Sequence, residues 1–303
     1  MQAMLLAAGL GTRLRPHTLV RPKPLFPVLN RPLLEILLDM LDLAGCGRVV
    51  VNAHHLADQV ERVTSRRKGV VFQFEPEILG TGGSLREALP NFTDEPLLVM
   101  NGDIFHDIDL KALYAHHLRS GNRITLALHD FPRFNTVGIE GEKVRTFSVR
   151  PGGNPGDVLA FTGIHVVEPE VIGMIPEGRF FHVIDLYEQL ASQGGGVGYV
   201  RVDGSCWRDI GTPEDYLDLH AMLLSGAVEQ RLPVGSPPSG PWLVAENARL
   251  DEGVILDGWG CVGRAHIGRG ARLKDCVVWD GAVIPPGAEC NHEIVTPEIN
   301  SEG

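Results

Sequence analysis

Hydrophobic residues in the first part of the chain occur in short continuous runs that alternate with stretches of helical spacing. Residues 1–8 form one apolar run, and Leu34, Leu37, Leu38 and Leu41 then recur at the spacing of one helix face. Further strands are predicted at 48–52, 69–75, 96–103 and 123–130, and further helices at 55–63, 83–89 and 109–120. Because strands alternate with helices, we predict an α/β domain with a mixed, mostly parallel sheet that has helices on both faces.

The pattern is less regular after residue 131. Strands are predicted at 159–167 and 197–202, with a helix near 184–193 between them. A last helix is predicted after Thr212, which is a suitable N-cap, because Pro213 fits the first helical position and acidic residues follow in the first turn.

Beyond this helix the composition changes. The stretch "GSPPSGP" at 235–241 is typical of a linker. A six-residue repeat then covers residues 244–290, and an aliphatic or bulky residue, Trp279 among them, opens nearly every unit. Since such hexads turn one residue inward on each flat face, we predict a short left-handed parallel β-helix. The predicted organisation is a catalytic domain at 1–225, a linker at 226–243, the β-helix at 244–290 and a tail at 291–303.

Composition narrows the class of protein. The chain is 44% hydrophobic and 21% charged, which is ordinary for a globular protein, and its five cysteines are scattered without a CxxC pair. This usage argues against a disulfide framework and a zinc cluster, and for a reducing compartment. The apolar start is too short for a membrane span and lacks a preceding basic region. We therefore expect a cytoplasmic protein with no membrane partner.

The opening loop, "GLGTRLRPHTLVRPKP" at residues 9–24, carries the strongest chemical signal. Residues 1–34 contain five basic side chains and no carboxylate, although the formal net charge of the chain is −11. Local cations in an acidic protein indicate a small anionic ligand rather than a nucleic acid. Gly9 and Gly11 allow backbone amides to approach a phosphate, but Leu14 does not fit a dinucleotide fingerprint and the GK[ST] of a P-loop is absent.

The same loop resembles the N-terminal signature of the sugar-1-phosphate nucleotidyltransferases, GxGTRLxPxTxxxPKP, at every defined position. The resemblance continues through "LGTGGSLREA", "NGD", "FTGIHVV" and "WRDIGTPEDY" and covers residues 1–225. It implies a Rossmann-like domain that transfers a nucleotidyl group from an NTP to a sugar-1-phosphate and releases pyrophosphate. Because the attacking phosphate oxygen is already anionic, this reaction needs cations and alignment rather than a catalytic base.

The resemblance also implies roles for individual residues. Arg13 would cover the α-phosphate and the departing pyrophosphate, and Lys23 would contact the sugar phosphate. For Arg15 and Arg21 the alternative is a solvated loop charge, and we favour this interpretation for Arg21. The nucleotide would be held by the opening loop and by a glycine-rich loop before the helix at 83–89: Ala8, Gly9, Gly11, Thr12, Gly80, Thr81, Gly82 and Gly83.

Two aspartates are candidate ligands for Mg²⁺. Asp103 ends the predicted strand "PLLVMNGD", and Asp209 lies in "WRDIGT". Mg²⁺ is commonly bound by a few carboxylates and by substrate phosphates. In isolation Asp103 also suits a turn, and Asp209 a position near a helix start, but the resemblance assigns both to the metal. It places the sugar at Thr162 and Gly163, with Asp185 as a further candidate.

The nucleobase and the sugar are less defined. "LGTGGSL" resembles guanylyltransferases that act on mannose-1-phosphate or a heptose-1-phosphate, which we favour, whereas other segments resemble uridylyltransferases that act on N-acetylmuramic acid 1-phosphate. A third hypothesis is a non-catalytic paralogue that binds a nucleotide-sugar and regulates a partner, and the presence of Arg13, Lys23, Asp103 and Asp209 together argues against it. The β-helix is expected to serve in a homo-oligomer contact or in regulation.

Overall fold

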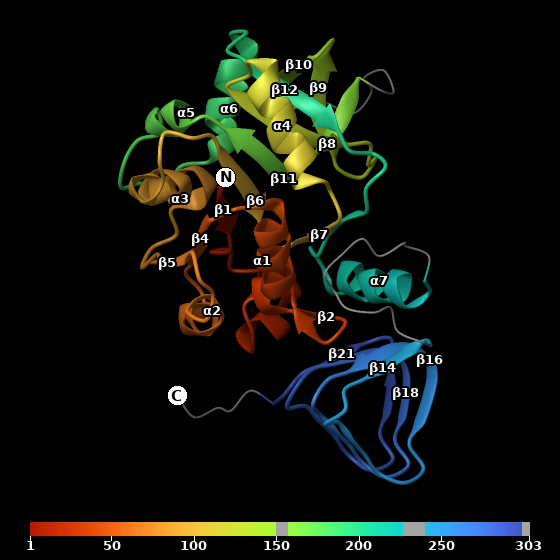
Figure 1. Cartoon of the computed structure of the whole chain (residues 1–303). Helices are drawn as coiled ribbons and strands as arrows, with labels where there is room; N and C mark the ends of the chain where they lie inside the picture. The colour runs from red at the N-terminus through yellow and green to blue at the C-terminus, as the bar shows by residue number, and fades with distance from the viewer. Residues whose placement is uncertain (150–156, 227–239, 299–303) are drawn as a thin grey trace. The chain divides into compact units, whose positions relative to one another are not determined.

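Residues 1–149, 157–226 and 240–298 are described by the computed structural model of the chain (Figure 1). The chain divides into two compact units. The first comprises Met1–Gly9 and Met40–Trp207, and the second comprises Leu10–Asp39 and Arg208–Gly303. Most of the predicted linker at 226–243 and the end of the predicted tail lie outside the described residues.

Helices and strands follow the sequence prediction closely. The described α-helices are α1 (Leu33–Ala44), α2 (Ala57–Thr64), α3 (Gly80–Ala88), α4 (Leu110–Ser120), α5 (Pro169–Gly173), α6 (Val183–Ser192) and α7 (Pro213–Leu224). The strands are β1 (Gln2–Leu6), β2 (Pro27–Val28), β3 (Arg31–Pro32), β4 (Arg48–Ala53), β5 (Val70–Phe74), β6 (Leu97–Asn101), β7 (Ile104–His106), β8 (Ile124–His129), β9 (Asn135–Glu140), β10 (Lys143–Thr146), β11 (Val158–Val167), β12 (Val197–Arg201), β13 (Trp207–Asp209), β14 (Trp242–Val244), β15 (Arg249–Leu250), β16 (Ile255–Val262), β17 (His266–Ile267), β18 (Arg272–Val278), β19 (Val283–Ile284), β20 (Glu289–Asn291) and β21 (Ile294–Val295). The Thr212 side chain caps α7 as predicted, since its hydroxyl accepts from the Asp215 N–H at 3.2 Å. Among the described helices, none is long and apolar enough to cross a membrane.

A nine-stranded mixed sheet forms the centre of the first unit, in the order β5-β4-β1-β6-β11-β8-β12-β10-β9. The strands β5, β4, β1 and β6 are parallel, and Ala3 of β1 aligns with Val49 of β4 and Leu98 of β6. β11 runs antiparallel to both β6 and β8. The mixed sheet is confirmed, but parallel pairing is less extensive than predicted, because the second half of the sheet contains antiparallel pairs that apolar runs alone do not reveal.

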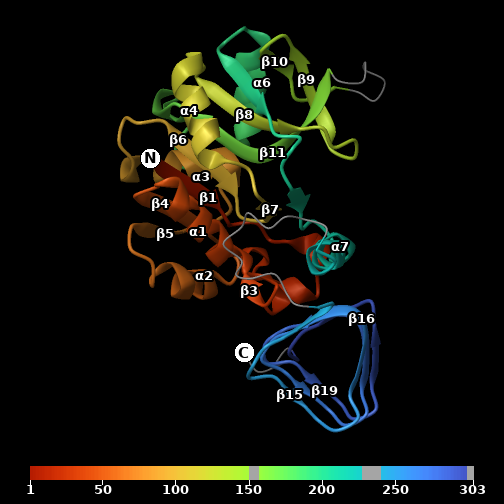
Figure 2. The ribbon, with the colours of Figure 1, turned by 45° about the vertical axis from the view of Figure 1, so that its right-hand side comes forward.

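Helices cover both faces of this sheet (Figures 1 and 2). Side chains alternate along β8: Ile124, Leu126 and Leu128 belong to the buried core that also contains residues of α3, α5 and α6. Thr125 points to the other face, where its hydroxyl lies 2.9 Å from Nδ1 of His117 in α4. With both faces covered, the carboxyl edge of the parallel strands is the place where a ligand site is expected.

Parallel strands also build residues 242–295, the C-terminal parallel-strand region of the second unit (Figure 2). One sheet has the order β14-β16-β18-β20, and another has the order β15-β17-β19. Trp242 aligns with Gly260, eighteen positions later, and Arg249 aligns with His266, seventeen positions later. This offset corresponds to three hexads, with one residue missing in some turns.

The core of this region contains only some of the residues that open hexads, and Val244 and Leu250 are each 37% exposed. Val262, Ile267 and Leu273 open hexads and lie in the buried core. Trp279 also opens a hexad, but its fully buried ring lies 4.6 Å from the ring of Phe26. The prediction for Trp279 is wrong, because the hexad spacing does not reveal that a distant segment of the chain packs against this side chain.

Three buried histidines make the fold sensitive to acid. Burial lowers the pKa of His106 and of His165 to about 3, and that of His220 to about 4. The His165 ring lies with Nε2 2.8 Å from the Tyr187 hydroxyl, and the His220 ring has Nδ1 2.9 Å from the Tyr216 carbonyl. Each ring is therefore neutral in the folded protein at pH values where an unfolded histidine is charged.

We expect the free energy of unfolding to fall as the pH decreases from about 6.5 toward 4. Below the unfolded pKa of about 6.5 the unfolded chain binds protons that the folded chain does not, so each buried histidine removes up to about 1.4 kcal/mol per pH unit. Urea unfolding at several pH values measures the effect, and His165→Gln should show a shallower dependence than the parent protein. A free energy that stays constant over this range would contradict the buried neutral rings.

Candidate functional site

The first part of the candidate site lies at the carboxyl edge of the parallel strands in the first unit. The Gly102 N–H donates to the carbonyl of Leu6, the last residue of β1, at 2.7 Å, and a Cβ on Gly102 would lie 2.9 Å from that oxygen. Asp103 follows this close contact and is partly exposed. The chain continues from β1 through the buried Ala8 and the exposed Gly9. Open α/β sheets bind their ligands at this edge.

A buried polar cluster adjoins the end of β1. Asn52 connects the cluster to the segment after β1. Its Oδ1 accepts from the Ala7 N–H at 2.8 Å, and its Nδ2 donates to Glu75 Oε1 at 2.7 Å. Asn52 Nδ2 also donates to the hydroxyl of Ser84, in α3, at 3.0 Å. Glu75 is 1% exposed, and its Oε2 has no hydrogen-bond partner among the residues that the structure describes. A buried acceptor without a donor is costly, so this oxygen is suited to a donor on a ligand.

The sequence interpretation missed Asn52 and Glu75, although a signal was present. Each residue is the last of a predicted strand, "RVVVN" or "GVVFQFE". Polar side chains at the ends of two neighbouring parallel strands are typical of the ligand-binding edge of a sheet.

The helix predicted at 83–89 begins three residues earlier, so the alternative of a tight loop before it is wrong for Gly80, Thr81 and Gly82. Gly80, Thr81, Gly82 and Gly83 are the first four residues of α3. A Cβ on Gly82 would lie 2.8 Å from the Phe181 ring, and one on Gly83 would lie 2.7 Å from the Arg179 carbonyl. The Gly82 N–H also donates to the Phe181 carbonyl at 2.9 Å. Close packing thus explains the small residues, and their contact with the nucleotide stays a prediction.

The residues predicted to meet the sugar also belong to the first unit. Thr162 is 1% exposed, and its hydroxyl donates to the Ala127 carbonyl at 2.8 Å. Gly163 has a φ of +78°, and a Cβ there would lie 2.5 Å from Nδ2 of Asn101. Asp185 is exposed in the first turn of α6. Thr162 and Gly163 therefore have structural roles in β11, and their contact with a sugar stays a prediction.

The second part of the candidate site lies in the second unit and brings together Arg13, Lys23 and Asp209. Lys23 Nζ is 3.7 Å from Asp209 Oδ1, and the two side chains are 8% and 18% exposed. A Cβ on Gly211 would lie 2.3 Å from Asp209 Oδ2 and 3.2 Å from both terminal nitrogens of Arg13. Three of the predicted site residues therefore share one small region, and the absence of a side chain at Gly211 leaves room for them.

The loop that carries Arg13 is shaped by Gly11. Gly11 has a φ of +59°, which favours glycine, and a Cβ there would lie 2.7 Å from the methyl group of Thr18. The Thr18 hydroxyl donates to the Gly11 carbonyl at 3.1 Å. Thr12 and Arg13 follow in an exposed 3-10 turn that ends at the buried Leu14. The turn therefore presents Thr12 and Arg13 at the surface of its unit.

The interpretation of Arg21 as a solvated loop charge is wrong. Its guanidinium lies 5.0 Å from the centre of the Trp279 ring, within the range of a cation–π interaction. Burial lowers the pKa of Arg21, and the nearby Asp280 opposes this effect. Arg15, by contrast, is exposed. Composition of the loop alone could not distinguish the two arginines, because the partner of Arg21 comes from the C-terminal region.

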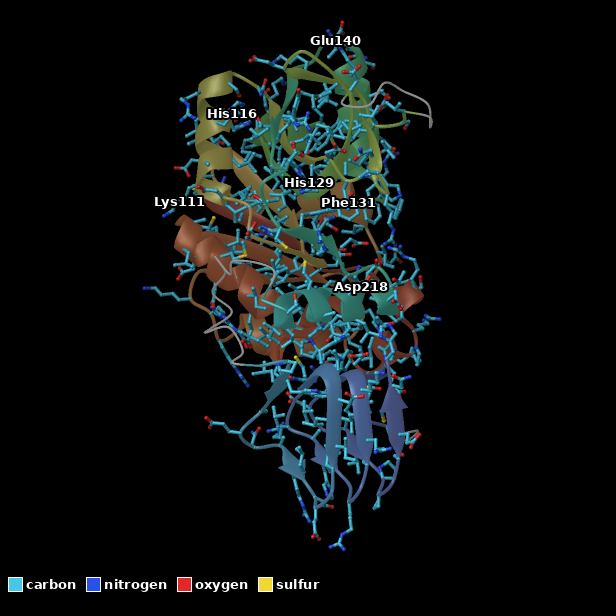
Figure 3. The ribbon with its side chains drawn as sticks, turned by 90° about the vertical axis from the view of Figure 1, so that its right-hand side faces the viewer. Lys111, His116, His129, Phe131, Glu140 and Asp218 are labelled. Atoms are coloured by element: carbon cyan, nitrogen blue, oxygen red, sulfur yellow. The ribbon has the colours of Figure 1, made fainter. Side chains whose placement is uncertain are left out.

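Trp207, which opens the "WRDIGT" segment, is fixed by aromatic neighbours in the first unit. The ring centres of His129, Phe131 and Phe134 lie 6.2, 5.5 and 5.6 Å from that of Trp207. Figure 3 shows His129 and Phe131 close to one another. The indole N–H of Trp207 donates to the Thr162 carbonyl at 2.9 Å. This cluster links the segment to β11.

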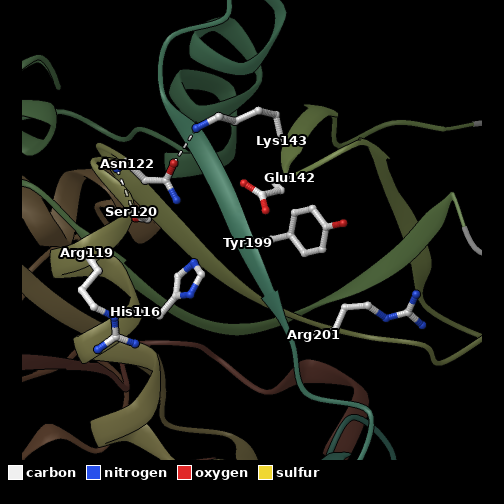
Figure 4. A pocket seen from close by; sticks show the side chains of 8 residues that line it. All are labelled: His116, Arg119, Ser120, Asn122, Glu142, Lys143, Tyr199 and Arg201. Atoms are coloured by element: carbon white, nitrogen blue, oxygen red, sulfur yellow. Dashed lines mark hydrogen bonds between the residues drawn. The ribbon is translucent and has the colours of Figure 1, made fainter.

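A cavity of about 490 Å³ in the first unit is also lined by basic side chains (Figure 4). Lys143 Nζ donates to Asn122 Oδ1 at 2.6 Å, and Arg201 pairs with Asp203 at 2.7 Å. Arg119 lies in the last turn of α4, where positive charge is favourable. These contacts give the cations structural roles, and the cavity contains none of the predicted site residues.

Comparison with known proteins agrees with this description. Residues 2–226 match the family described as "Nucleotidyl transferase", and the chain belongs to this family. It is therefore an enzyme, and its class is that of the sugar-1-phosphate nucleotidyltransferases. The family membership expected from the opening loop is confirmed.

Relatives and a solved structure extend the match. The chain is 33% identical to a mannose-1-phosphate guanylyltransferase of Mycobacterium tuberculosis over 295 residues, which cover 94% of this chain and 81% of that protein. It is 34% identical to an N-acetylmuramate alpha-1-phosphate uridylyltransferase of Neisseria meningitidis serogroup B over 223 residues, which cover 70% of this chain and 94% of that protein. The crystal structure of HddC from Yersinia pseudotuberculosis has a similar fold, with a TM-score of 0.62, 24% identity, and coverage of 72% of this chain and 97% of that chain.

Gly211→Ala should lower the rate of nucleotidyl transfer by about ten-fold or more, because displacement of charged groups by even about 1 Å is costly to catalysis. The new Cβ would meet Asp209 Oδ2 at 2.3 Å and the Arg13 guanidinium at 3.2 Å. Gly204→Ala is a matched control, since a Cβ there meets nothing within 4 Å. Pyrophosphate release by folded samples measures the effect, and equal rates in the two variants would contradict the crowding at Gly211.

Proposed function

We propose that the protein is a guanylyltransferase that transfers GMP from GTP to mannose-1-phosphate or a heptose-1-phosphate and releases pyrophosphate. The observation that carries the choice of base is the buried carboxylate of Glu75, whose Oε2 lacks a donor among the described residues. Guanine presents two adjacent donors, N1–H and N2–H, which suit a group that only accepts hydrogen bonds. Uracil presents a single donor between two carbonyl acceptors, which suits a carboxylate less well.

The relatives include both classes of enzyme, so the choice of base rests on Glu75. Coverage does not separate the classes, because a guanylyltransferase from Mycobacterium tuberculosis matches 94% of the chain and a UTP–glucose-1-phosphate uridylyltransferase from Synechocystis matches 97%. The identity of 34% to the uridylyltransferase from Neisseria meningitidis favours a uridylyltransferase acting on N-acetylmuramic acid 1-phosphate as the second candidate.

In the proposed reaction a phosphate oxygen of the sugar-1-phosphate attacks the α-phosphorus of GTP, and the bond from that phosphorus to pyrophosphate breaks. No proton has to be removed from the attacking oxygen, so the residues of the site act by binding and alignment. Arg13 would bind the phosphates of the nucleotide, on which negative charge increases as pyrophosphate leaves. Lys23 would bind the sugar phosphate, and Asp209, 3.7 Å from its ammonium group, would orient it.

Backbone and loop residues complete the proposed contacts. The chain from Ala8 to Thr12 would hold the nucleotide phosphates, and the first turn of α3 would lie against the base. The link from Ser84 in α3 through Asn52 to Glu75 supports a base site at this edge. The sugar would meet the backbone at Thr162 and Gly163, and the exposed Asp185 would accept from its hydroxyls.

Mg²⁺ is the cofactor that we propose. Asp103 and Asp209 supply the hard carboxylate oxygens that Mg²⁺ prefers, and both residues are partly exposed. An ion held by such a carboxylate would neutralise part of the charge of the triphosphate. Lys23 and Arg13 would contribute the remaining positive charge.

For the C-terminal parallel-strand region we propose a short left-handed β-helix with its repeats at 244–290. The offset of seventeen or eighteen residues between aligned strands supports this architecture. Ile255 and Val283 are 44% and 67% exposed, and such apolar side chains suit a contact between copies of the chain.

Pyrophosphate release with defined substrate pairs tests the proposed reaction. With Mg²⁺ present, GTP and UTP are each combined with mannose-1-phosphate, a heptose-1-phosphate and N-acetylmuramic acid 1-phosphate. We expect release with GTP and one of the first two sugars. Release only with UTP and N-acetylmuramic acid 1-phosphate would establish the second candidate instead, and no release with any pair would refute the proposal.

Glu75→Gln should reduce kcat/KM for GTP by about ten-fold or more, because a buried donor would then face the donors of guanine. The kcat/KM for UTP should fall much less than the kcat/KM for GTP. Glu77→Gln is the matched control, since Glu77 is exposed two residues further along the chain. An equal loss for GTP and UTP in Glu75→Gln would show that Glu75 does not read the base.

A further inference from the structure

Lys23 lies in a segment with little secondary structure of its own. Residues 21–30 contain one 3-10 turn, Lys23–Leu25, and the two-residue strand β2. Lys23 is nevertheless only 7% exposed, and residues 22–29 are all buried. Since a short 3-10 turn supplies few hydrogen bonds, packing from other elements must fix this segment.

Trp279, from the C-terminal parallel-strand region, supplies that packing. Its side chain is 0% exposed, and its ring centre lies 4.6 Å from that of Phe26, with the two rings nearly perpendicular at 68°. The guanidinium of Arg21 lies 5.0 Å from the same ring. Arg21 and Phe26 stand on either side of Lys23 in the sequence. The segments on both sides of the turn that carries Lys23 therefore contact the same indole.

Hydrogen bonds join the same indole to the backbone of the segment. The Trp279 N–H donates to the Tyr216 hydroxyl at 3.1 Å, and that hydroxyl donates to the Pro27 carbonyl. One turn further along α7, His220 accepts from the Leu29 N–H at 3.3 Å. Trp279 thus orients the tyrosine that binds the residue directly after Phe26.

We propose that Trp279 is a positioning residue for nucleotidyl transfer, which fixes the turn that places Lys23. The inference rests on the proposed role of Lys23 in binding the sugar phosphate. The core of the C-terminal region is built from other side chains, such as Val262, Ile267 and Leu273. The buried indole therefore packs against the segment 21–30 rather than in the core of its own region. Through this contact the C-terminal region contributes to the position of Lys23.

Two substitutions of buried residues test the proposal. Trp279→Leu removes the indole that supports Arg21, Phe26 and Tyr216. Leu273→Ala is the matched control, because Leu273 is also 0% exposed but lies in the core of its own region. Well below both melting temperatures, we expect Trp279→Leu to lower kcat/KM for the sugar-1-phosphate by about ten-fold or more, and Leu273→Ala to stay within about two-fold of the parent. Trp279→Phe, which keeps a ring against Phe26, should recover part of the loss.

Chemical labelling of Lys23 gives a readout that does not depend on activity. Acetic anhydride should modify the buried Lys23 slowly in the parent protein and several-fold faster in Trp279→Leu, as measured by mass spectrometry. Lys111, which is exposed in α4, serves as the internal reference (Figure 3). If Trp279→Leu does not fold, the labelling rate of Lys23 is compared between Trp279→Phe and the parent protein instead.

The outcomes separate this inference from the proposed function. Equal losses of kcat/KM in Trp279→Leu and Leu273→Ala, or unchanged kinetics and labelling in Trp279→Leu, would overturn the positioning role. If the parent protein releases no pyrophosphate with any substrate pair, the proposed function fails, whereas selective labelling of Lys23 in Trp279→Leu would still support the role of Trp279 in fixing the segment.

Discussion

The pair formed by Lys23 and Asp209 is the interaction on which the candidate site depends. The ammonium and the carboxylate lie 3.7 Å apart, with side chains only 8% and 18% exposed. A charge so poorly hydrated is tolerated because its partner is near, and loss of either group would remove this compensation from the other. The neighbouring Gly211 and Arg13 are arranged around the same carboxylate. Two cationic groups and one carboxylate thus meet in an acidic protein, in the region where polyanionic substrates are proposed to bind.

Rigid support for this cationic loop comes from side chains outside it. Residues 10–30 contain only 3-10 turns and one two-residue strand. Their order comes from buried groups elsewhere in the second unit, above all Tyr216 and Trp279. Catalysis by alignment requires such support, because long basic side chains lose considerable entropy when they are held in place.

Local periodicity predicted the elements well and their partners poorly. The spacing of leucines located α1, and Thr212 with Pro213 located the start of α7. The same reasoning overestimated parallel pairing and pointed Trp279 inward, because the period of a strand or hexad does not reveal what packs against it. The resemblance identified Arg13, Lys23 and Asp209, which the structure brings together.

The features that the sequence interpretation missed also depend on tertiary contacts. Glu75 and Asn52 matter through hydrogen bonds to residues far away in the sequence. The sequence interpretation places Gly80 and Gly82 before the predicted helix, whereas both belong to α3 and their small size allows its contact with residues 180–183. Each of these features depends on tertiary neighbours, and no pattern along a single chain encodes them directly.

The position of Trp279 has a consequence for biosynthesis. The ribosome makes the cationic loop more than two hundred residues before it makes the indole of Trp279. A nascent chain therefore carries its basic loop without the aromatic support described above, even if the central sheet has already formed. Under the proposed role of Trp279, competence for catalysis is delayed until the C-terminal parallel-strand region has been made.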